Sequence, residues 1–276
     1  MPNQVPLNPL ILVKFVLWIA VIVGATILLR RRRVTSGVRL AFLVAGVLIF
    51  GFLFGILIPQ GLNPNPVASL RTLLRSALVR RQLAAPIAVM LLILLATVFV
   101  SNKSICGWGC QLGLLQDLLH RVGLPKWRPP FWLSNTVRVG AFGALVAGLL
   151  VAGLDWIGVI DPFQIFSLNF TLGIVLFTLA VLVASLFVYR PWCHFLCPFG
   201  LLGWLVEQVS VFRPRINREA CKACKICVRA CPGQAMADIY DGKAVHADCF
   251  ACGACIEACP RDEALGWWSK SEAGER

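Results

Sequence analysis

The chain has 276 residues, of which 58% are hydrophobic and 14% charged, and its formal net charge is +13. Its mean hydropathy of +0.79 excludes an ordinary soluble domain, because such domains are far more polar. The basic residues lie mainly in loops beside apolar stretches, which is typical of membrane orientation and does not indicate nucleic-acid binding.

Five apolar stretches predict helices that cross a membrane. They cover Leu10–Leu29, Val38–Ile58, Leu83–Val100, about Val137–Leu154 and about Leu172–Tyr189. The first is about long enough to span the hydrocarbon core. The basic run Arg30–Arg33 follows it, whereas a secretory signal carries its charge in front and ends at a cleavage site. We therefore expect an uncleaved first helix with a periplasmic N-terminus and Arg30–Arg33 in the cytoplasm.

The loops between these stretches carry the orientation signal. Pro59-Gln60-Gly61 ends the second span, and the amphipathic stretch Leu70–Val79 predicts a helix lying on the outer membrane surface. Its Arg71 and Arg75 oppose the positive-inside rule, so an inverted topology is the alternative. The basic loop after the third span and the acidic loop at Asp161 favour a multi-pass protein of the bacterial inner membrane with its C-terminal domain in the cytoplasm.

Two segments of the membrane part look alike. One contains Cys106-x-x-x-Cys110 and then Gly113-Leu114-Leu115, and the other contains Cys193-x-x-x-Cys197 and then Gly200-Leu201-Leu202. Both segments start inside, go out and return, which predicts parallel repeats that bring the four cysteines to equal depth. Three interpretations of these cysteines stand side by side: ligands of a further iron–sulfur cluster or another metal, a redox-active dithiol pair, or ordinary buried cysteines.

The C-terminal part carries a doubled cysteine run. Cys221-x-x-Cys224-x-x-Cys227-x-x-x-Cys231-Pro232 recurs 28 positions later as Cys249-x-x-Cys252-x-x-Cys255-x-x-x-Cys259-Pro260. This is the ligand run of two [4Fe–4S] clusters, in which the fourth cysteine of each run serves the other cluster. We therefore expect one cluster at Cys221, Cys224, Cys227 and Cys259, and the other at Cys249, Cys252, Cys255 and Cys231. Disulfides would need an oxidising compartment, and zinc sites usually use two cysteine pairs.

Between the runs, Ala237–Val245 alternates around Asp241-Gly242, which predicts a β-hairpin. Three basic residues lie within the first run, where they should raise a cluster's reduction potential or else dock an acidic partner or anionic lipid: Lys222, Lys225 and Arg229. The predicted fold is an all-α polytopic membrane domain, with about five transmembrane helices and two parallel internal repeats, plus a small α+β two-cluster ferredoxin-like domain. The expected boundaries are 1–37 for an N-terminal helix and basic loop, 38–210 for the membrane domain and 211–276 for the ferredoxin-like domain.

The two CxxxC motifs and the doubled C-terminal run together resemble the NapH/MauN family over roughly residues 38–265, and the membrane core of NosR is related to this family. The resemblance implies four spans, cytoplasmic clusters, and electron flow from membrane quinol towards a periplasmic reductase. The chain would then be the quinol dehydrogenase component of a larger complex. Gln111 stands where the family usually has a proline, and the span Leu10–Leu29 is extra.

We therefore expect a protein that passes electrons from quinol to a partner redox protein, either ferredoxin-like or of cytochrome c type. His194 is the first candidate for accepting a quinol proton, because it lies between two motif cysteines and titrates near neutral pH. Asp117, His120 and Glu207 are expected on solvated faces of interfacial helices, and Trp108, Trp192 and Trp204 are expected as interface anchors. Two other functions stay open: an accessory factor that reduces a metal or thiol for a respiratory enzyme, and a redox sensor.

Overall fold

The computed structural model describes residues 9–58 and 65–274 and has helices at all five apolar stretches. They are α1 (Pro9–Arg30), the continuous run of α2 (Ser36–Gly46), η1 (Val47–Leu53) and α3 (Phe54–Leu57), then α5 (Ala85–Ser101), α7 (Phe131–Ala152) and α9 (Leu172–Phe187). Three of them are long and apolar enough to cross a membrane: Pro9–Arg30, Ser36–Leu57 and Phe131–Ala152. Helices α5 and α9 are apolar but shorter. The expected breaker at 59–61 lies outside the described residues.

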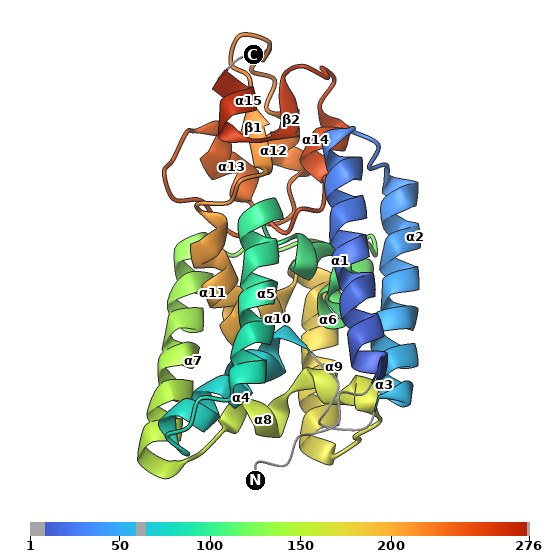
Figure 1. Ribbon diagram of the computed structural model, residues 1–276. Helices are drawn as coiled ribbons and strands as arrows, with labels where there is room; N and C mark the ends of the chain where they lie inside the picture. The colour runs from blue at the N-terminus through green and yellow to red at the C-terminus, as the bar shows by residue number, and fades with distance from the viewer. Residues whose placement is uncertain (1–8, 59–64, 275–276) are drawn as a thin grey trace.

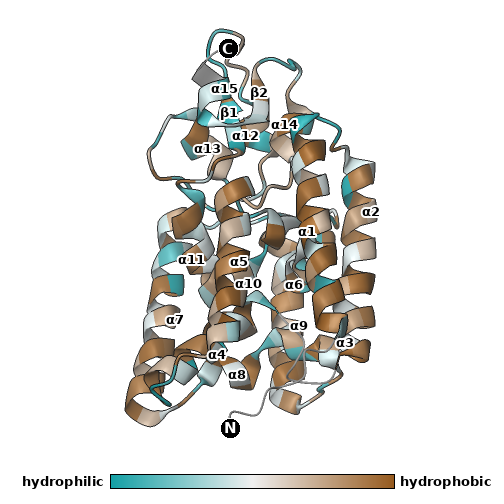
Figure 2. Cartoon of the chain, in the orientation of Figure 1, coloured by the Kyte–Doolittle hydropathy of each residue, from teal (hydrophilic) through white to brown (hydrophobic). Residues whose placement is uncertain are grey.

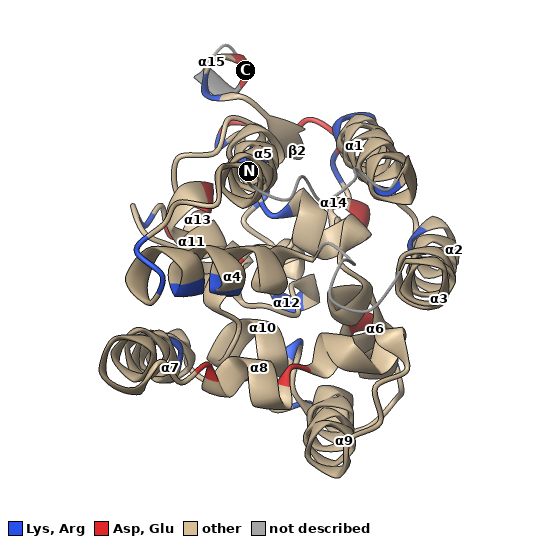
Figure 3. Cartoon of the chain, turned by 60° about the horizontal axis from the view of Figure 1, so that its bottom comes forward, with Lys and Arg blue, Asp and Glu red and all other residues tan. Residues whose placement is uncertain are grey.

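The long helices stand around shorter ones. Figures 1 and 3 show α1, α2, α5, α7 and α9 surrounding α4 (Pro66–Leu78), α6 (Gln111–His120) and α10 (Pro191–Phe195). The outward faces of the long helices are mostly apolar (Figure 2), and Leu92 and Val151 are 65% and 89% exposed. The blue and red segments of Figure 3, which mark the charged residues, lie mainly at the ends of the long helices or on the elements inside the ring. This inside-out pattern is what a lipid solvent requires.

Helix α4 lies across the end of the membrane part that is remote from the C-terminal domain (Figure 1). The Asn65 side chain caps it by accepting from the Ala68 amide at 2.7 Å, and Pro66 follows as the first helical residue. Arg71 pairs with Asp155 at 3.1 Å and with Asp161 at 3.6 Å, on either side of α8 (Trp156–Ile160). This arginine, which opposed the orientation rule in the sequence, is therefore balanced by two carboxylates.

The C-terminal domain is built on one antiparallel strand pair. Strand β1 (Arg213–Ile216) pairs with β2 (Leu265–Trp268), with Arg213 opposite Trp268, and four short helices complete the domain: α12 (Ile226–Ala230), α13 (Ala235–Tyr240), α14 (Ala254–Ala258) and α15 (Lys270–Gly274). The predicted hairpin at Ala237–Val245 is wrong, because 235–240 is helical. Alanine and methionine in this stretch favour a helix, and Asp241-Gly242 ends it as a turn with Gly242 at φ +72°.

The C-terminal domain is bound tightly to the membrane part. Arg32 donates to the carbonyl oxygens of Ile256 and Cys259, both at 3.0 Å. The Trp108 indole donates to the Ala251 carbonyl at 2.8 Å. Gly107 has no room for a Cβ, because one built there would overlap the carbonyl oxygen of Phe250. The extra N-terminal helix and the first CxxxC loop thus hold this domain in place.

Candidate iron–sulfur sites

The first predicted cysteine set surrounds one cavity. A space of about 390 Å³ is lined by Cys221, Cys224, Cys227 and Cys259. Three of these come from the first run and the fourth comes from the second run, as predicted. Lys222 and Lys225 also line this cavity. Positive charge therefore lies directly beside the candidate cluster.

The second set surrounds another cavity. A space of about 400 Å³ is lined by Cys249, Cys252, Cys255 and Cys231, with apolar neighbours such as Met236 and Trp267. Burial raises the pKa of Cys231 to about 11, so binding of a metal at neutral pH would displace its proton.

The two runs fold alike, which explains the exchange of ligands. Ala223 and Ala251 have φ of +54° and +51°, and Lys225 and Gly253 have φ of +54° and +82°. These left-handed residues turn each loop so that three thiols face the same space. Cys231 and Cys259 then end α12 and α14 in extended backbone at ψ 115° and 120°. Each distal thiol is thereby carried to the loop of the other run.

The donor sets fit four-iron clusters better than single ions. No group of three His, Cys, Asp or Glu side chains in the described ranges, 9–58 and 65–274, is close enough to hold a single metal ion. A tetrahedral zinc site would need its sulfurs about 2.3 Å from one centre. Four thiols that line one cavity without converging on a single point suit a larger [4Fe–4S] cube, whose ligands are cysteine thiolates.

The four CxxxC cysteines are also brought together. Cys106 interacts electrostatically with Cys110 and Cys193, and Cys197 interacts with all three others. All four side chains are buried. Cys110 caps α6, and Cys197 caps α11 (Pro198–Glu207) while its sulfur accepts from the Gly200 amide at 3.2 Å. A helix N-terminus favours negative charge, which suits a thiolate.

The two pairs have matching backbone contacts. The amide of Cys110 donates to the Ile105 carbonyl at 2.8 Å, and the amide of Cys197 donates to the Trp192 carbonyl at 2.9 Å. The acceptor lies five residues earlier in each case. A Cβ at Gly113 would lie 2.8 Å from the Cys106 carbonyl oxygen, and one at Gly200 would lie 2.7 Å from that of Cys193. Each glycine therefore permits the same close approach. This is why Gly-Leu-Leu follows both cysteine pairs.

A shell of buried charged side chains surrounds these cysteines, and its presence was not predicted from the sequence. Among the described residues, five basic side chains are buried there, namely Lys14, Arg39, Lys103, Arg138 and Arg190, together with three carboxylates, Asp117, Glu207 and Asp248. Basic charge is therefore in excess. Lys14 and Arg138 lie inside predicted spans, where burying an ionisable residue costs free energy and such a residue marks a functional site. Their positions in the sequence could therefore have indicated this shell.

Two buried arginines bind the cysteine loops directly. Arg190 donates to the Cys106 carbonyl at 2.6 Å and pairs with Asp117 at 2.8 Å. Arg138 donates to the Cys193 carbonyl at 3.4 Å and pairs with Asp248 at 2.9 Å. Since Asp248 precedes Cys249, the same salt bridge reaches the second cluster loop.

Phe250 joins the second cluster loop to the membrane cysteines. It lies between Cys249 and Cys252, and its ring is 5.9 Å from that of Tyr189 and 5.2 Å from that of His194. The Arg190 guanidinium lies 4.8 Å from the same ring. The second cysteine cavity is consequently the one that faces the membrane cysteines.

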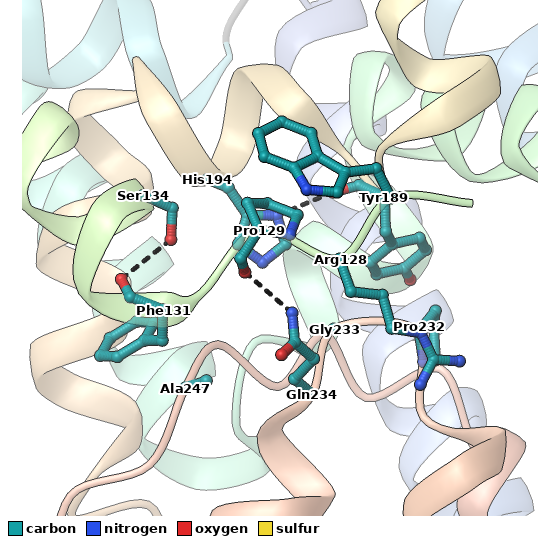
Figure 4. A pocket seen from close by; sticks show the side chains of 11 residues that line it. Arg128, Pro129, Phe131, Ser134, Tyr189, His194, Pro232, Gly233, Gln234 and Ala247 are labelled. Atoms are coloured by element: carbon teal, nitrogen blue, oxygen red, sulfur yellow. Dashed lines mark hydrogen bonds between the residues drawn. The ribbon is translucent and has the colours of Figure 1, made fainter.

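His194 lies in a separate cavity of about 330 Å³, shown in Figure 4 beside Pro129 and Tyr189. Its Nδ1 donates to the Tyr189 carbonyl at 2.8 Å, which leaves Nε2 as the acceptor. Burial lowers the pKa of His194 to about 4, so the ring is neutral at neutral pH. Gln234 closes the cavity by donating to the Pro129 carbonyl at 2.9 Å (Figure 4).

Several predicted surface residues are buried. The solvated-face prediction is wrong for Asp117 and Glu207, which are 6% and 0% exposed, because both pair with buried cations. His120 is half-buried, with Nδ1 donating to the Ser185 carbonyl at 3.2 Å. Trp108 and Trp192 are not interface anchors either, being 0% and 1% exposed. The C-terminal domain covers Trp108 and Glu207, whereas Trp192 packs against Phe177 inside the membrane part. Trp204, which was also expected as an anchor, is partly buried and donates to the His246 carbonyl at 2.9 Å.

Comparison with known families agrees with these sites. A model described as "4Fe-4S dicluster domain" matches residues 213–260, and one described as "4Fe-4S binding domain" matches residues 83–130 and 170–218. No solved structure matches the chain. The second model thus covers both CxxxC motifs, and the first covers the whole doubled run with all eight of its cysteines.

Three curated relatives are similar over about half of their own length. The putative electron transport protein YccM of Escherichia coli is 28% identical over 63% of this chain and 54% of the relative. The methylamine utilization ferredoxin-type protein MauN of Paracoccus denitrificans is 32% identical over 58% and 59%, and the ferredoxin-type protein NapH of Haemophilus influenzae is 26% identical over 51% and 51%. With its candidate membrane helices and iron–sulfur domains, the chain is similar to the NapH/MauN type of membrane ferredoxins.

Proposed function

We propose that this chain passes electrons from membrane quinol, through two [4Fe–4S] clusters, to a partner redox protein of a periplasmic reductase system. The observation that carries the proposal is the pair of cavities, each lined by four cysteines drawn from both runs. When bound, each cluster supplies a one-electron carrier. Cys221, Cys224, Cys227 and Cys259 would hold one cluster, and Cys249, Cys252, Cys255 and Cys231 the other.

The four membrane cysteines form a third redox centre in this proposal, most simply another iron–sulfur cluster. Four thiolates around iron carry net negative charge, and the excess of buried basic side chains around Cys106, Cys110, Cys193 and Cys197 would balance it. A redox-active dithiol pair is the competing assignment, and the iron content separates the two.

The membrane arrangement proposed here has five spans, with α5 and α9 crossing despite their length, and two parallel repeats. The double match of one family model, at 83–130 and 170–218, supports the repeats. The domain boundaries stay at 1–37, 38–210 and 211–276. A cytoplasmic C-terminal domain and a periplasmic N-terminus are supported by Arg30 and Arg32, which bind that domain.

The donor reaction balances with these centres. One quinol loses two protons and two electrons to become a quinone, and one electron goes to each of two clusters. The protons need acceptors beside a cluster, and His194 is one candidate because its Nε2 is left to accept. The partner that receives the electrons is proposed to be ferredoxin-like or of cytochrome c type.

The proposal is tested on full-length protein purified without oxygen. Iron and acid-labile sulfide should reach about eight per chain with two clusters and about twelve with three. A soluble quinol analogue should bleach the cluster absorption, and a quinone should restore it. Iron-loaded protein that quinol cannot reduce would instead support an accessory or sensor role.

A further inference from the structure

A second polar cavity lies between the membrane part and the C-terminal domain. The space in it that solvent molecules can occupy is about 360 Å³, and its lining includes Arg39, Asp117, His120, Tyr189, Cys252 and Glu257. This falls within the range of small-molecule sites, which is about 300–1,000 Å³. Because Cys252 is a proposed cluster ligand, a molecule in this cavity would touch the wall of the second cluster site.

Arg39 lines this cavity, and its side chain has buried hydrogen-bond donors without a partner among the described residues. Its side chain is buried, and its Nη2 already donates to Asp117 at 2.7 Å and to the Gly107 carbonyl at 2.8 Å. Its Nε and Nη1 have no hydrogen-bond partner among the described residues. The Trp108 ring, 4.4 Å from the guanidinium carbon, holds the group in place. A buried donor without a partner is costly, so an oxygen of a ligand is the natural partner.

His120 offers the complementary acceptor. Its Nδ1 lies 3.2 Å from the Ser185 carbonyl, which can only accept, so Nδ1 carries the proton and Nε2 is bare. The His120 and Tyr189 rings meet edge to face with centroids 5.3 Å apart. Tyr189 in turn donates to Asp117 at 3.2 Å. The cavity thus combines donors for one ligand oxygen with an acceptor for a ligand hydroxyl.

The charges favour a neutral ligand over an anion. Arg39 is already paired with Asp117, and the wall's second carboxylate, Glu257, is matched by a second arginine, Arg121, so the lining carries no excess of either charge. The thiolates of the second cluster site would repel an anion as well. Further along α2, Leu40 and Val44 are 43% and 42% exposed, so an apolar tail has a surface to follow.

We infer that this cavity binds the head group of quinol, a neutral aromatic diol, with one oxygen at Arg39 and one hydroxyl at His120. This inference rests on the proposed function and names its donor site. It places quinol, the electron donor, against the second cluster site, which also faces the membrane cysteines through Phe250.

The test uses full-length, iron-loaded protein in detergent and a fluorescent quinone-site inhibitor of the hydroxyquinoline N-oxide type. Binding is measured by quenching of its fluorescence. His120→Leu and Arg39→Gln should each weaken binding about tenfold or more, because each removes a hydrogen bond. Thr72→Val is the matched control, since Thr72 lines a polar cavity of about 780 Å³ at the other end of the membrane part.

A second measurement does not depend on turnover. In dithionite-reduced protein, bound inhibitor should change the electron paramagnetic resonance signal of one cluster in the wild type and not in His120→Leu. If His120→Leu loses its iron, His120→Gln, which keeps an accepting carbonyl, should retain part of the affinity.

The possible failures are distinguishable. Binding that is indifferent to His120 and Arg39 substitutions, or that His194→Gln weakens instead, overturns this site while quinol reduction of the wild type still supports the function. Wild-type clusters that quinol cannot reduce overturn the function and the site's role together.

Discussion

Lys103 and Arg190 occupy matching places, each three residues before the first cysteine of its CxxxC pair, and each side chain is fully buried against a carboxylate. Lys103 pairs with Asp248 in the C-terminal domain, whereas Arg190 pairs with Asp117 in the membrane part. Each CxxxC segment therefore supplies a buried cation at the same place, one that binds the C-terminal domain and one that binds the membrane part.

Asp117 is the single carboxylate at which Arg39, Arg190 and the Tyr189 hydroxyl converge. Asp117→Asn leaves two buried guanidinium groups without their counter-charge, which should cost about 3–5 kcal/mol. Thermal unfolding of the purified protein should show a lowered midpoint. The exposed Asp241→Asn is the control and should unfold as the wild type does. An Asp117→Asn protein of unchanged stability would contradict the central role of this carboxylate.

The exchange of the fourth ligand can be tested by combining substitutions. Cys224→Ala and Cys259→Ala affect the same cavity, so the double variant should lose about four irons, no more than either single variant. Cys224→Ala with Cys231→Ala affects both cavities and should lose about eight. Iron per chain is the measurement. If the Cys224–Cys231 double variant lost only one cluster, each run would hold its own cluster instead.

Asp161 gives a dependence of stability on pH. Burial raises its pKa to about 6, although Arg71 opposes the shift. Between about pH 4 and 6 the folded carboxyl holds a proton that the unfolded one has lost, so stability falls as pH rises through this window. The loss at neutral pH is at most about 3 kcal/mol.

Asp161→Asn should remove this pH dependence. Its melting midpoint relative to the wild type should therefore increase from pH 5 to pH 7.5. Comparing the two proteins cancels other titrating groups. A difference that stays constant or shrinks with rising pH would show that Arg71 keeps Asp161 ionised throughout.

The cysteines that line each cavity could be grouped from the sequence, whereas their surroundings could not, for a physical reason. The spacing of the cysteines involves only residues close together in the sequence, so the roles of Cys221 and Cys249 can be predicted from the motif alone. The burial of Glu207 and Trp108 involves the C-terminal domain folding back over the helix ends, where Glu207 accepts from the Cys249 amide and Trp108 donates to the Ala251 carbonyl. Asp117 is buried against Arg39 and Arg190 from other segments of the membrane part. An amphipathic pattern compares a residue with water or lipid only, so it does not register a contact such as that of Trp108 with Ala251, 143 residues away. The hairpin prediction failed similarly, because a turn signal at Asp241 does not say which elements flank it.

The last prediction concerns Arg32, which follows the extra N-terminal helix. Its guanidinium donates to the carbonyls of Ile256 and Cys259 and pairs with Asp262, so it holds the chain beside a proposed ligand of the first cluster. Arg32→Ala removes charged hydrogen bonds worth about 1.5–3 kcal/mol each to groups that are partly solvated. Hydrogen exchange across 256–265 should become faster, and the first cluster should be lost sooner in air.

Arg33→Ala is the matched control, because the neighbouring Arg33 is exposed. It carries the same charge in the same basic run, so a mere change in membrane orientation would affect both variants equally. Faster exchange in Arg32→Ala alone would establish the helix end as a clamp on the C-terminal domain. Equal hydrogen-exchange rates in the two variants would show that the whole basic run acts only as a topology signal.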